Sequence, residues 1–280
     1  MEVFTRIADV RRALGSSRRE GRSIGFVPTM GYLHAGHEAL VQAARAECDT
    51  VVVSIFVNPL QFAPGEDFES YPRDSERDRE ILTRAGADIL FMPSVADIYP
   101  RPLLTEVSLP ELSRTLEGRT RPTHFQGVAT VVLKLLHIVW PDRAYFGQKD
   151  GQQVAVVRRL CDDLDLPLDL RVVPTVRESD GLALSSRNVY LSPAERRAAP
   201  TLYAALLQGR SAALEGRRGA DVAAEIEAAI AREPLIRLDY AAVVDPETMQ
   251  PKDALQGRVM LAVAARLGRT RLIDNIVLEL

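Results

Sequence analysis

Runs of apolar, often β-branched residues alternate with segments of helical periodicity through the first two thirds of the chain. Several of these runs lack a polar face, as the strands of a buried parallel sheet require. The predicted strands cover residues 23–29, 50–57, 87–93, 143–147 and 168–175, and the predicted helices cover 36–47, 74–86 and 151–164. This succession predicts an α/β fold with a Rossmann-like, doubly wound parallel sheet. Such sheets bind ligands at the carboxyl ends of their strands, where the strand order reverses.

The pattern changes near residue 190. Ser192 and Glu195 enclose Pro193 in a capping box, with proline at the first helical position. Alanine-rich helical sequence follows, and then three more strands are predicted at 238–245, 258–267 and 270–280. A second, smaller α/β domain explains this change. We therefore expect one domain over residues 1–188 and a C-terminal domain over residues 189–280.

Composition and charge narrow the class of protein. The chain has 280 residues, of which 46% are hydrophobic, and 35 basic against 38 acidic residues give a net charge of −3. Both signs are scattered along the chain, which argues against a surface for duplex nucleic acid. Cys48 and Cys161 fit no zinc or redox spacing, so we expect buried thiols in a reducing compartment.

No segment of the sequence predicts insertion into a membrane. Residues 1–15 predict an amphipathic helix without the apolar core of a signal peptide. The most apolar helical segment, residues 127–140, contains Lys134 and His137 and is too short to cross a bilayer. We therefore expect a soluble cytoplasmic protein.

Two of the four histidines lie together in VPTMGYLHAGHEALV, residues 27–41, between a predicted strand and a predicted helix. The segment has the glycine spacing of a P-loop, but His37 and Glu38 stand where lysine and serine or threonine are needed. At a helix start, unpaired N–H groups favour an anion, and His34 and His37 add donors for phosphate. A zinc pair is the weaker alternative, because no third histidine or CxxC stands nearby.

Three other segments carry candidate chemistry. Ser185, Ser186 and Arg187 offer two hydroxyls and a fixed cation in one loop, which suits charge developing on a phosphate chain. Residues 145–153, YFGQKDGQQ, place a lysine and an aspartate where a strand ends and a helix begins. Residues 54–73 contain two neutral amides beside apolar residues, a combination typical of small-molecule pockets. Ordinary polar loops and loop capping remain alternatives for each.

These segments, in this order, resemble one family, pantothenate synthetase (pantoate–β-alanine ligase). The similar motifs are PTMGYLHAGH, SIFVNPLQF, RPTHFQGVATVVLKL, FGQKDGQQ and DGLALSSRN. HxGH and SSRN also resemble the HIGH and KMSKS-type signatures of the wider nucleotidyltransferase superfamily, which includes class I aminoacyl-tRNA synthetases. One departure is Leu184, which stands where the family often has methionine.

The resemblance implies a reaction in which ATP, (R)-pantoate and β-alanine give pantothenate, AMP and pyrophosphate. It implies a pantoyl-adenylate intermediate, Mg²⁺, a homodimer, and a smaller C-terminal domain that covers the active site. A protein of this family needs no nucleic acid and no membrane. The ligands of the metal are not indicated by the sequence.

The resemblance also assigns roles to residues. Catalytic donors and cations are implied at His34, His37, Lys149, Ser185, Ser186 and Arg187, with His37 as proton donor. ATP contacts are implied for Met30, Gly31, Tyr32, Leu33, His34, Ala35, Gly36, His37, Gly147, Gln148, Lys149, Asp150, Val176, Leu184, Ser185, Ser186 and Arg187. Substrate contacts are expected for Asn58, Gln61 and Gln153, of which Gln61 and Gln153 would hold pantoate.

Two competing hypotheses use the same residues. A nucleotidyltransferase acting on a phosphorylated acceptor would need further basic residues, whereas Asn58, Gln61 and Gln153 are neutral. A nucleotide sensor without catalysis would not need groups that grip a leaving phosphate. A tRNA ligase is disfavoured because no basic anticodon-reading domain is evident.

Overall fold

The computed structural model describes residues 1–280, and the chain divides into two compact units. The first unit holds Met1–Ser113, Arg121–Gly147 and Val156–Val173, and the second holds Arg114–Thr120, Gln148–Ala155 and Pro174–Leu280. The second unit thus begins before the boundary that we expected after residue 188. The loop before that boundary belongs to it because Arg177 forms an ion pair with Asp274.

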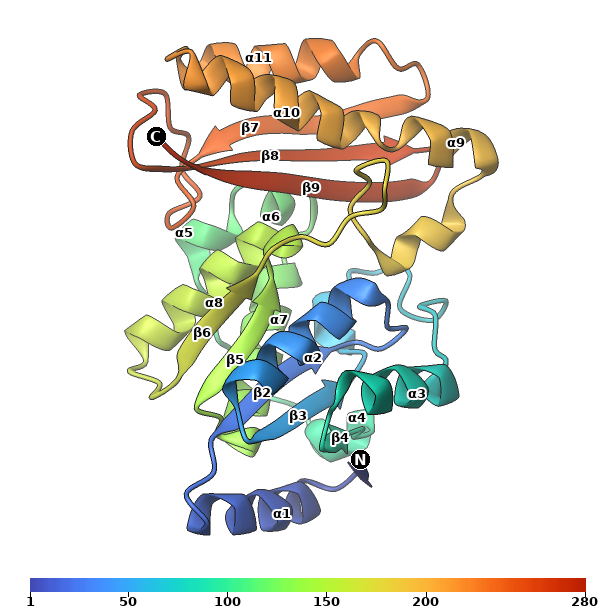
Figure 1. Cartoon of the computed structure of the whole chain (residues 1–280), viewed down its shortest axis with the longest axis vertical. Coiled ribbons are helices and arrows are strands. Elements are labelled where there is room, and N and C mark those ends of the chain that lie inside the picture. Colours follow the sequence, from blue (N-terminus) through green and yellow to red (C-terminus); the bar gives the residue numbers. More distant parts are fainter. The chain divides into compact units, whose positions relative to one another are not determined.

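The first unit is built on a six-stranded parallel sheet with the order β1-β4-β3-β2-β5-β6 (Figure 1). The strands are β1 (Glu2–Phe4), β2 (Ile24–Thr29), β3 (Thr50–Ile55), β4 (Ile89–Phe91), β5 (Arg143–Gly147) and β6 (Asp169–Val173). The doubly wound parallel sheet is therefore confirmed, and each strand predicted in this part of the chain is present. The chain runs outward from β2 in both directions, so the order reverses beside β2.

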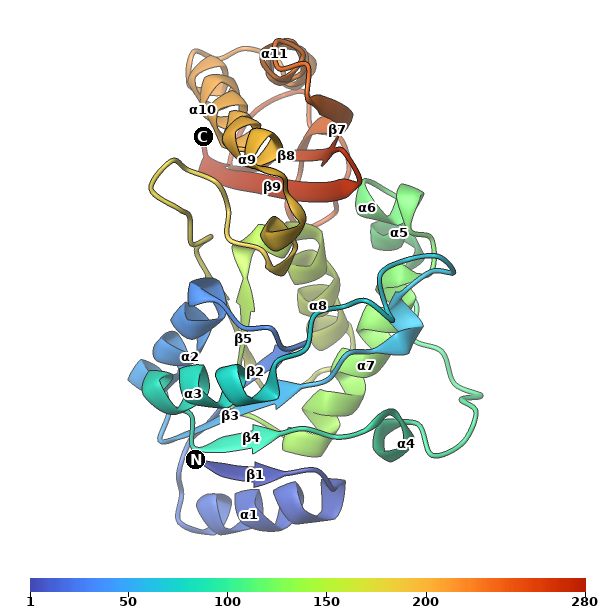
Figure 2. The same ribbon diagram turned by 90° about the vertical axis from the view of Figure 1, so that its right-hand side faces the viewer.

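Helices cover both faces of this sheet. The long ones are α1 (Ile7–Arg19), α2 (Ala35–Glu47), α3 (Ser75–Ala85), α7 (His124–Val139) and α8 (Gly151–Asp163). The same part of the chain also forms two one-turn helices, α4 (Val95–Ile98) and α5 (Pro110–Ser113). Figure 2 shows α2 and α3 on one face and α7 and α8 on the other. Val41 of α2 and Leu82 of α3 are fully buried against Val27 and Val53 of the sheet. Burial of such side chains is the main force that holds these layers together.

The N-terminus differs from our prediction. Residues 1–15 were expected to form one amphipathic helix, but Glu2–Phe4 form strand β1, and α1 begins only at Ile7. Val3 and Phe4 pair with Leu90 and Phe91 of β4, at the edge of the sheet. β-Branched and aromatic residues fit such a pairing well, and an open sheet edge overrides the helical periodicity that follows.

The second unit consists of a three-stranded antiparallel sheet with helices packed against it. Its strands are β7 (Ile236–Val244), β8 (Arg258–Leu267) and β9 (Thr270–Glu279), and its helices are α6 (Glu117–Thr120), α9 (Pro193–Ala198), α10 (Thr201–Leu214) and α11 (Gly219–Ile230). Leu206 and Ile226 are buried against Val263 in one apolar cluster. Figure 1 shows α10 and α11 on the same side of this sheet. The smaller α/β unit and the capping box of α9 are thus confirmed.

Two further properties of the chain follow from the structure. Cys48 and Cys161 are both buried and form no disulfide, as expected. None of the helices combines the length and the hydropathy that a membrane-spanning helix needs.

Candidate active site

The carboxyl ends of β2 and β3 place two of the predicted segments next to each other. β2 ends at Thr29, directly before the histidine segment, and β3 ends at Ile55, just before Asn58. The two strands are parallel neighbours, with Thr29 opposite Ile55. β5, the neighbour of β2 on its other side, ends at Gly147. This is the position at which doubly wound sheets bind their ligands.

The turn after β2 is held by a carboxylate that the sequence analysis did not single out. Asp78 of α3 accepts hydrogen bonds from the backbone N–H groups of Tyr32, at 2.8 Å, and Leu33, at 2.7 Å. Its exposed fraction is 2%. Gly31 and Tyr32 have φ of 83° and 51°, in the left-handed region. This conformation directs the N–H groups of Tyr32 and Leu33 toward the Asp78 side chain. Burial raises the pKa of Asp78, and the two N–H bonds oppose that rise.

His34 is the N-cap residue of α2, and His37 lies in the first turn of that helix. The centroids of their rings are 4.2 Å apart. The Nδ1 atom of His34 accepts from the Gly36 N–H at 3.1 Å, and the His37 Nδ1 accepts from the His34 N–H at 3.4 Å. The two imidazoles therefore act as a reciprocal helix cap. Because each Nδ1 is an acceptor, a neutral ring carries its proton on Nε2, which makes Nε2–H a donor.

No group of three or more histidine, cysteine, aspartate or glutamate side chains in the structure is arranged to hold a metal ion. The zinc alternative needs at least one further protein ligand beside His34 and His37. The capping bonds give both Nδ1 atoms another partner. The geometry of this turn therefore favours hydrogen-bond donation by the Nε2 atoms over metal ligation.

Asn58 is the N-cap residue of a short helical turn, η1 (Pro59–Gln61), and Gln61 is its last residue. Asn58 is 1% exposed, and its amide donates to the Gln61 Oε1 at 3.2 Å and to the Gly127 carbonyl at 3.1 Å. Its Oδ1 accepts from Tyr99 at 2.8 Å. These bonds orient Asn58 and Gln61 relative to each other, and the expected contact of Asn58 with a substrate stays a prediction. The Gln61 Nε2 lies 3.1 Å from the Met30 sulfur, so these two predicted residues are neighbours.

The backbone of η1 lies directly against α7 at Gly127. A Cβ atom at this position would lie only 2.4 Å from the Leu60 carbonyl oxygen. Glycine is therefore required here by the close approach of two backbones rather than by a special φ. The family-like segment THFQG supplies this contact, and it thereby places Gln61.

Arg121 and His124 fix the chain just after Gln61. The Arg121 guanidinium forms two 2.7 Å hydrogen bonds with the Glu66 carboxylate, and its Nη2 donates to the Gln61 carbonyl at 3.2 Å. The Nδ1 of His124 lies 2.9 Å from the same carbonyl. Burial alone would raise the pKa of Glu66, but the hydrogen bonds and charge of Arg121, together with the Ala63 backbone and the charge of His124, lower it on balance.

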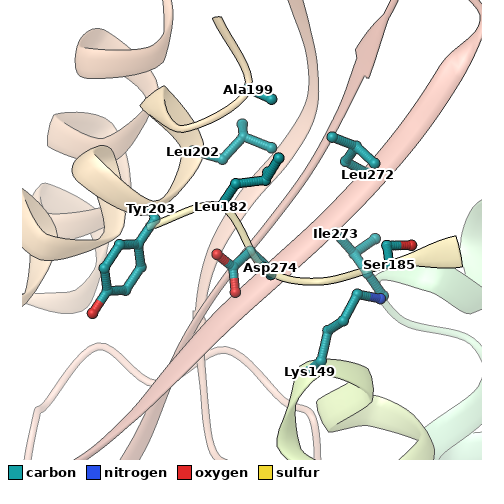
Figure 3. A pocket seen from close by; sticks show the side chains of 10 residues that line it. Lys149, Leu182, Ser185, Ala199, Leu202, Tyr203, Leu272, Ile273 and Asp274 are labelled. Atoms are coloured by element: carbon teal, nitrogen blue, oxygen red, sulfur yellow. The ribbon is translucent and has the colours of Figure 1, made fainter. Parts of the chain in front are cut away.

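The second unit carries the other group of predicted residues. Lys149, in η2 (Gln148–Asp150), and Ser185 line one small cavity together with Asp274 of β9. Figure 3 shows the Lys149 amine and the Ser185 hydroxyl on the side of this cavity that lies away from the Tyr203 ring. The cavity has a volume of about 10 Å³ and holds no more than a water molecule, so it is not itself a phosphate site. Its position shows that an ammonium and a hydroxyl, both groups that bind phosphate oxygens, lie near each other.

The serine loop has a defined internal geometry. Ser185 caps η3 (Ser186–Tyr190) by accepting from the Arg187 N–H at 3.3 Å. Asn188 donates to the Ala183 carbonyl at 3.1 Å, and Leu184 donates to the Val176 carbonyl at 3.0 Å. The loop therefore holds Ser185, Ser186 and Arg187 on one short turn. Gln153 lies in the first turn of α8 and is partly exposed.

Asp78 could have been found from the sequence. Within α3 the buried apolar residues are Ile81, Leu82 and Ala85, and Asp78 precedes them at helical spacing. It is thus an acidic residue on the buried face of an otherwise amphipathic helix. A carboxylate in that position requires hydrogen-bond donors, and here the turn after β2 supplies them.

The fold and these groups together define a class of protein. A doubly wound sheet with imidazole donors at a helix start and buried amides at the neighbouring strand end is the arrangement of a nucleotide-binding α/β enzyme.

Comparisons with known proteins identify the family. The model of the family pantoate-beta-alanine ligase matches residues 2–277. A pantothenate synthetase of Rhizobium johnstonii is 54% identical over 276 residues, which cover 98% of this chain and 91% of that protein. The crystal structure of pantothenate synthetase from Thermus thermophilus has a TM-score of 0.93 at 52% identity and covers 99% of both chains.

A third relative was solved with ligands. It is pantoate-beta-alanine ligase from Francisella tularensis, complexed with beta-gamma ATP and beta-alanine, with a TM-score of 0.81 and 37% identity. The match covers 99% of this chain and 97% of that one. The chain therefore belongs to the pantoate–beta-alanine ligase family, and it is an enzyme of the ligase class.

Proposed function

We propose that this enzyme condenses (R)-pantoate with β-alanine at the expense of ATP, through an enzyme-bound pantoyl adenylate. The main support is the family match over nearly the whole chain, together with the relative whose structure holds an ATP compound and beta-alanine. The structural observation that carries the nucleotide part is the histidine turn at the switch point of the sheet.

In the first step a carboxylate oxygen of pantoate attacks the α-phosphorus of ATP, and the bond to the departing pyrophosphate breaks. Negative charge then grows on the leaving group, so catalysis depends on donors placed beforehand. We assign that role to the Nε2–H groups of His34 and His37, the Lys149 ammonium, and the side chains of Ser185, Ser186 and Arg187. His37 is the candidate proton donor. Hydrogen bonds from these positioned groups stabilise the charge on the leaving pyrophosphate even without a proton transfer.

The remaining binding roles follow the family pattern. The backbone of Met30, Gly31, Tyr32, Leu33, Ala35 and Gly36 would contact ATP, as would Gly147, Gln148, Asp150, Val176 and Leu184. Gln61 and Gln153 would hold pantoate through its hydroxyl and carboxylate groups. The buried bond from Asn58 supports Gln61 in that orientation.

Mg²⁺ would enter this site with the nucleotide. The ion prefers oxygen ligands and is commonly held by one or two carboxylates together with substrate phosphates. Asp150 is a single carboxylate, 47% exposed, beside Lys149. These residues fit an ion held mainly by the phosphates of ATP, where it would neutralise their charge.

In the second step the amine of β-alanine attacks the adenylate carbonyl, AMP leaves, and the amine loses a proton. Orientation of the two reactants supplies most of the acceleration in such a step. Water must be excluded, because it would hydrolyse the mixed anhydride. The segment after Gln61, fastened by the pair of Arg121 and Glu66, is the candidate cover.

Pyrophosphate release tests this function. The enzyme is given ATP and Mg²⁺ with pantoate alone, and β-alanine is added afterwards. We expect a burst of one pyrophosphate per active site with pantoate, followed by sustained turnover to AMP and pantothenate once β-alanine is present.

Two other outcomes would contradict the proposal. Turnover only with a phosphorylated acceptor would favour another nucleotidyltransferase. Binding of ATP without any pantoate-dependent release would favour a nucleotide sensor.

We further propose that the enzyme is a cytoplasmic homodimer, on the basis of the family resemblance. Sedimentation equilibrium would give the mass in solution. A species of about one chain mass, 30.9 kDa, at micromolar concentration would contradict the dimer.

A further inference from the structure

Strand β9 carries two adjacent polar residues in its interior. Asp274 and Asn275 are each 4% exposed, although the neighbouring positions of the strand are mostly apolar. Aspartate and asparagine are disfavoured in strands, and buried polar groups require partners. Successive side chains of a strand point to opposite faces, so this pair can contact two different segments of the chain.

Asp274 anchors the loop that leads to Ser185. Its carboxylate forms a bidentate pair with Arg177, at 2.6 Å and 2.9 Å. The same guanidinium donates to the Gly181 carbonyl at 3.1 Å and lies 3.7 Å from the centre of the Tyr203 ring. Arg177 also pairs with Ala183 in an isolated β-bridge. Through Arg177, the buried Asp274 carboxylate therefore fixes both the start of the loop at Arg177 and its return at Gly181 and Ala183, just before Ser185.

Asn275 anchors the segment that carries Lys149. Its Nδ2 donates to the carbonyls of Gln148 and Lys149, both at 2.9 Å. Its Oδ1 accepts from the Gln148 side chain at 2.8 Å. The amide thus uses both donors and an acceptor on two consecutive residues. This arrangement fixes the backbone of η2 more closely than a single hydrogen bond would.

We propose that Asp274 and Asn275 are positioning residues that hold Lys149 and the Ser185–Arg187 turn in a common register for the phosphates of ATP. The two anchored segments meet at the cavity that Lys149, Ser185 and Asp274 line (Figure 3). The inference rests on the proposed function, because it assumes that these residues contact phosphate. Placement matters because a displacement of about 1 Å can cost roughly a hundredfold in rate.

A purely structural role is the alternative. In that case loss of either side chain would lower stability and the yield of folded enzyme, but the folded fraction would bind and activate ATP normally. The two roles are therefore separated by measurements on folded enzyme rather than by total activity.

The test compares the Asn275→Ala enzyme with the Thr270→Val enzyme. Thr270 is a buried residue of the same strand, and its hydroxyl has no hydrogen-bond partner. Valine is nearly isosteric with threonine, so Thr270→Val is a control for a polar-to-apolar change in β9. Three quantities are measured on folded protein: the Kd for ATP, the rate of the pyrophosphate burst with pantoate, and the KM for β-alanine.

We expect Asn275→Ala to weaken ATP binding or slow the burst by about tenfold or more, with the KM for β-alanine unchanged. Thr270→Val should match the wild type in all three. Asp274→Asn, which keeps the shape but removes the charge, should affect the same two ATP-linked quantities. The proposal would be overturned if Asn275→Ala and Asp274→Asn both kept the wild-type Kd for ATP and burst rate. It would also be overturned if Thr270→Val lost as much as they do.

A nearly isosteric second variant guards against misfolding of Asn275→Ala. Asn275→Asp keeps the acceptor for Gln148 but replaces the donor to two carbonyls with an acceptor. It should therefore impair ATP use at least as strongly as Asn275→Ala.

Failure of the proposed function would look different. If the wild type releases no pyrophosphate with pantoate, the reaction assigned above is wrong. The Kd for ATP still tests the positioning role in that case. An unchanged Kd in all the Asn275 and Asp274 variants would then refute it.

Discussion

The turn after β2 and the serine loop before α9 are both candidate phosphate contacts, and each is fastened by a buried carboxylate in a different way. In the first unit Asp78 accepts two backbone N–H groups of the turn itself. In the second unit Asp274 accepts a guanidinium, and the fastening runs through the Arg177 side chain. Burial raises the pKa of both carboxyls, against the lowering by their donors.

The two carboxylates differ in the part of the chain that they fix, since Asp78 binds the backbone and Asp274 binds a side chain. Backbone donors belong to the turn, so Asp78 specifies the path of the chain between Gly31 and Leu33 directly. An arginine side chain has several rotatable bonds, and its position depends on further contacts such as the Tyr203 ring. We therefore expect substitution at the anchor of the turn to act mainly on nucleotide binding, and substitution at the anchor of the serine loop to act on stability as well as on nucleotide binding.

The largest expected effect is on the ion pair of the second unit. Arg177→Met leaves the Asp274 carboxylate buried without a cation, and breaking such a pair costs about 3–5 kcal/mol of unfolding free energy. The double substitution Arg177→Met with Asp274→Leu removes both charges and should be closer to the wild type. Denaturant unfolding of the three enzymes and of Asp274→Leu completes the cycle. If the single and double variants lost the same unfolding free energy, the two side chains would contribute through packing rather than through their charges.

The next effect concerns the turn of the first unit. Asp78→Ala leaves the Tyr32 and Leu33 N–H groups without their acceptor, so the turn should lose its fixed path. We expect the Kd for ATP to rise about tenfold, or about 1.4 kcal/mol. The control is Asp74→Ala on the same helix, whose carboxylate caps α3 by accepting from the Arg77 N–H. That change should cost about 1 kcal/mol of stability but leave ATP affinity unchanged. An equal rise in Kd for both variants would contradict the role of Asp78.

Protonation of Asp78 should have a smaller effect, which raises the stability of the fold but lowers the affinity for ATP. Its pKa in the folded protein is raised, so its contribution to stability is present below the usual carboxyl pKa of about 3.9 and is lost as pH rises through the folded value. Acidification should therefore favour the fold at this group. A protonated carboxyl accepts less well, however, so ATP binding should weaken by roughly twofold to threefold over the same range.

This pH effect is measured against Asp78→Asn, which does not titrate. The unfolding free energy and the Kd for ATP of both enzymes are followed from neutral pH downward. As pH falls, the stability of the wild type should rise relative to the variant, while its ATP affinity should fall relative to it. Parallel curves for the two enzymes would mean that Asp78 does not titrate in this range.

The sequence predicted the architecture well because alternation and helical spacing are local properties. The five strands from β2 to β6, the long helices between them and the capping box at Ser192 all follow from patterns within single segments. The motif residues were recognisable for the same reason, since HxGH and SSRN are each contiguous. Strand β1 was missed because its place depends on the partner strand β4, far along the chain.

The supporting residues were harder to predict because their partners are distant in sequence. Asp78 lies 46 positions from Tyr32, and Asp274 lies 97 positions from Arg177. The Asn58 amide donates to Gly127, 69 positions away, a partner that the residues around Asn58 do not indicate. A polar residue on a buried face indicates that some partner exists, but only the fold identifies that partner.

The smallest effect is expected from the exposed side of the serine loop. Arg196 contacts Asp180 at 2.6 Å, with side-chain exposures of 32% and 41%. The Arg196 guanidinium lowers the pKa of Asp180, so its stabilisation is present above the usual carboxyl pKa and is lost as pH falls through the folded value. Solvent screens such pairs, so Arg196→Ala should cost no more than about 1 kcal/mol near neutral pH and less in high salt. A loss as large as that of Arg177→Met would mean that exposed and buried pairs fasten this loop equally, and the contrast between the two units would then need another cause.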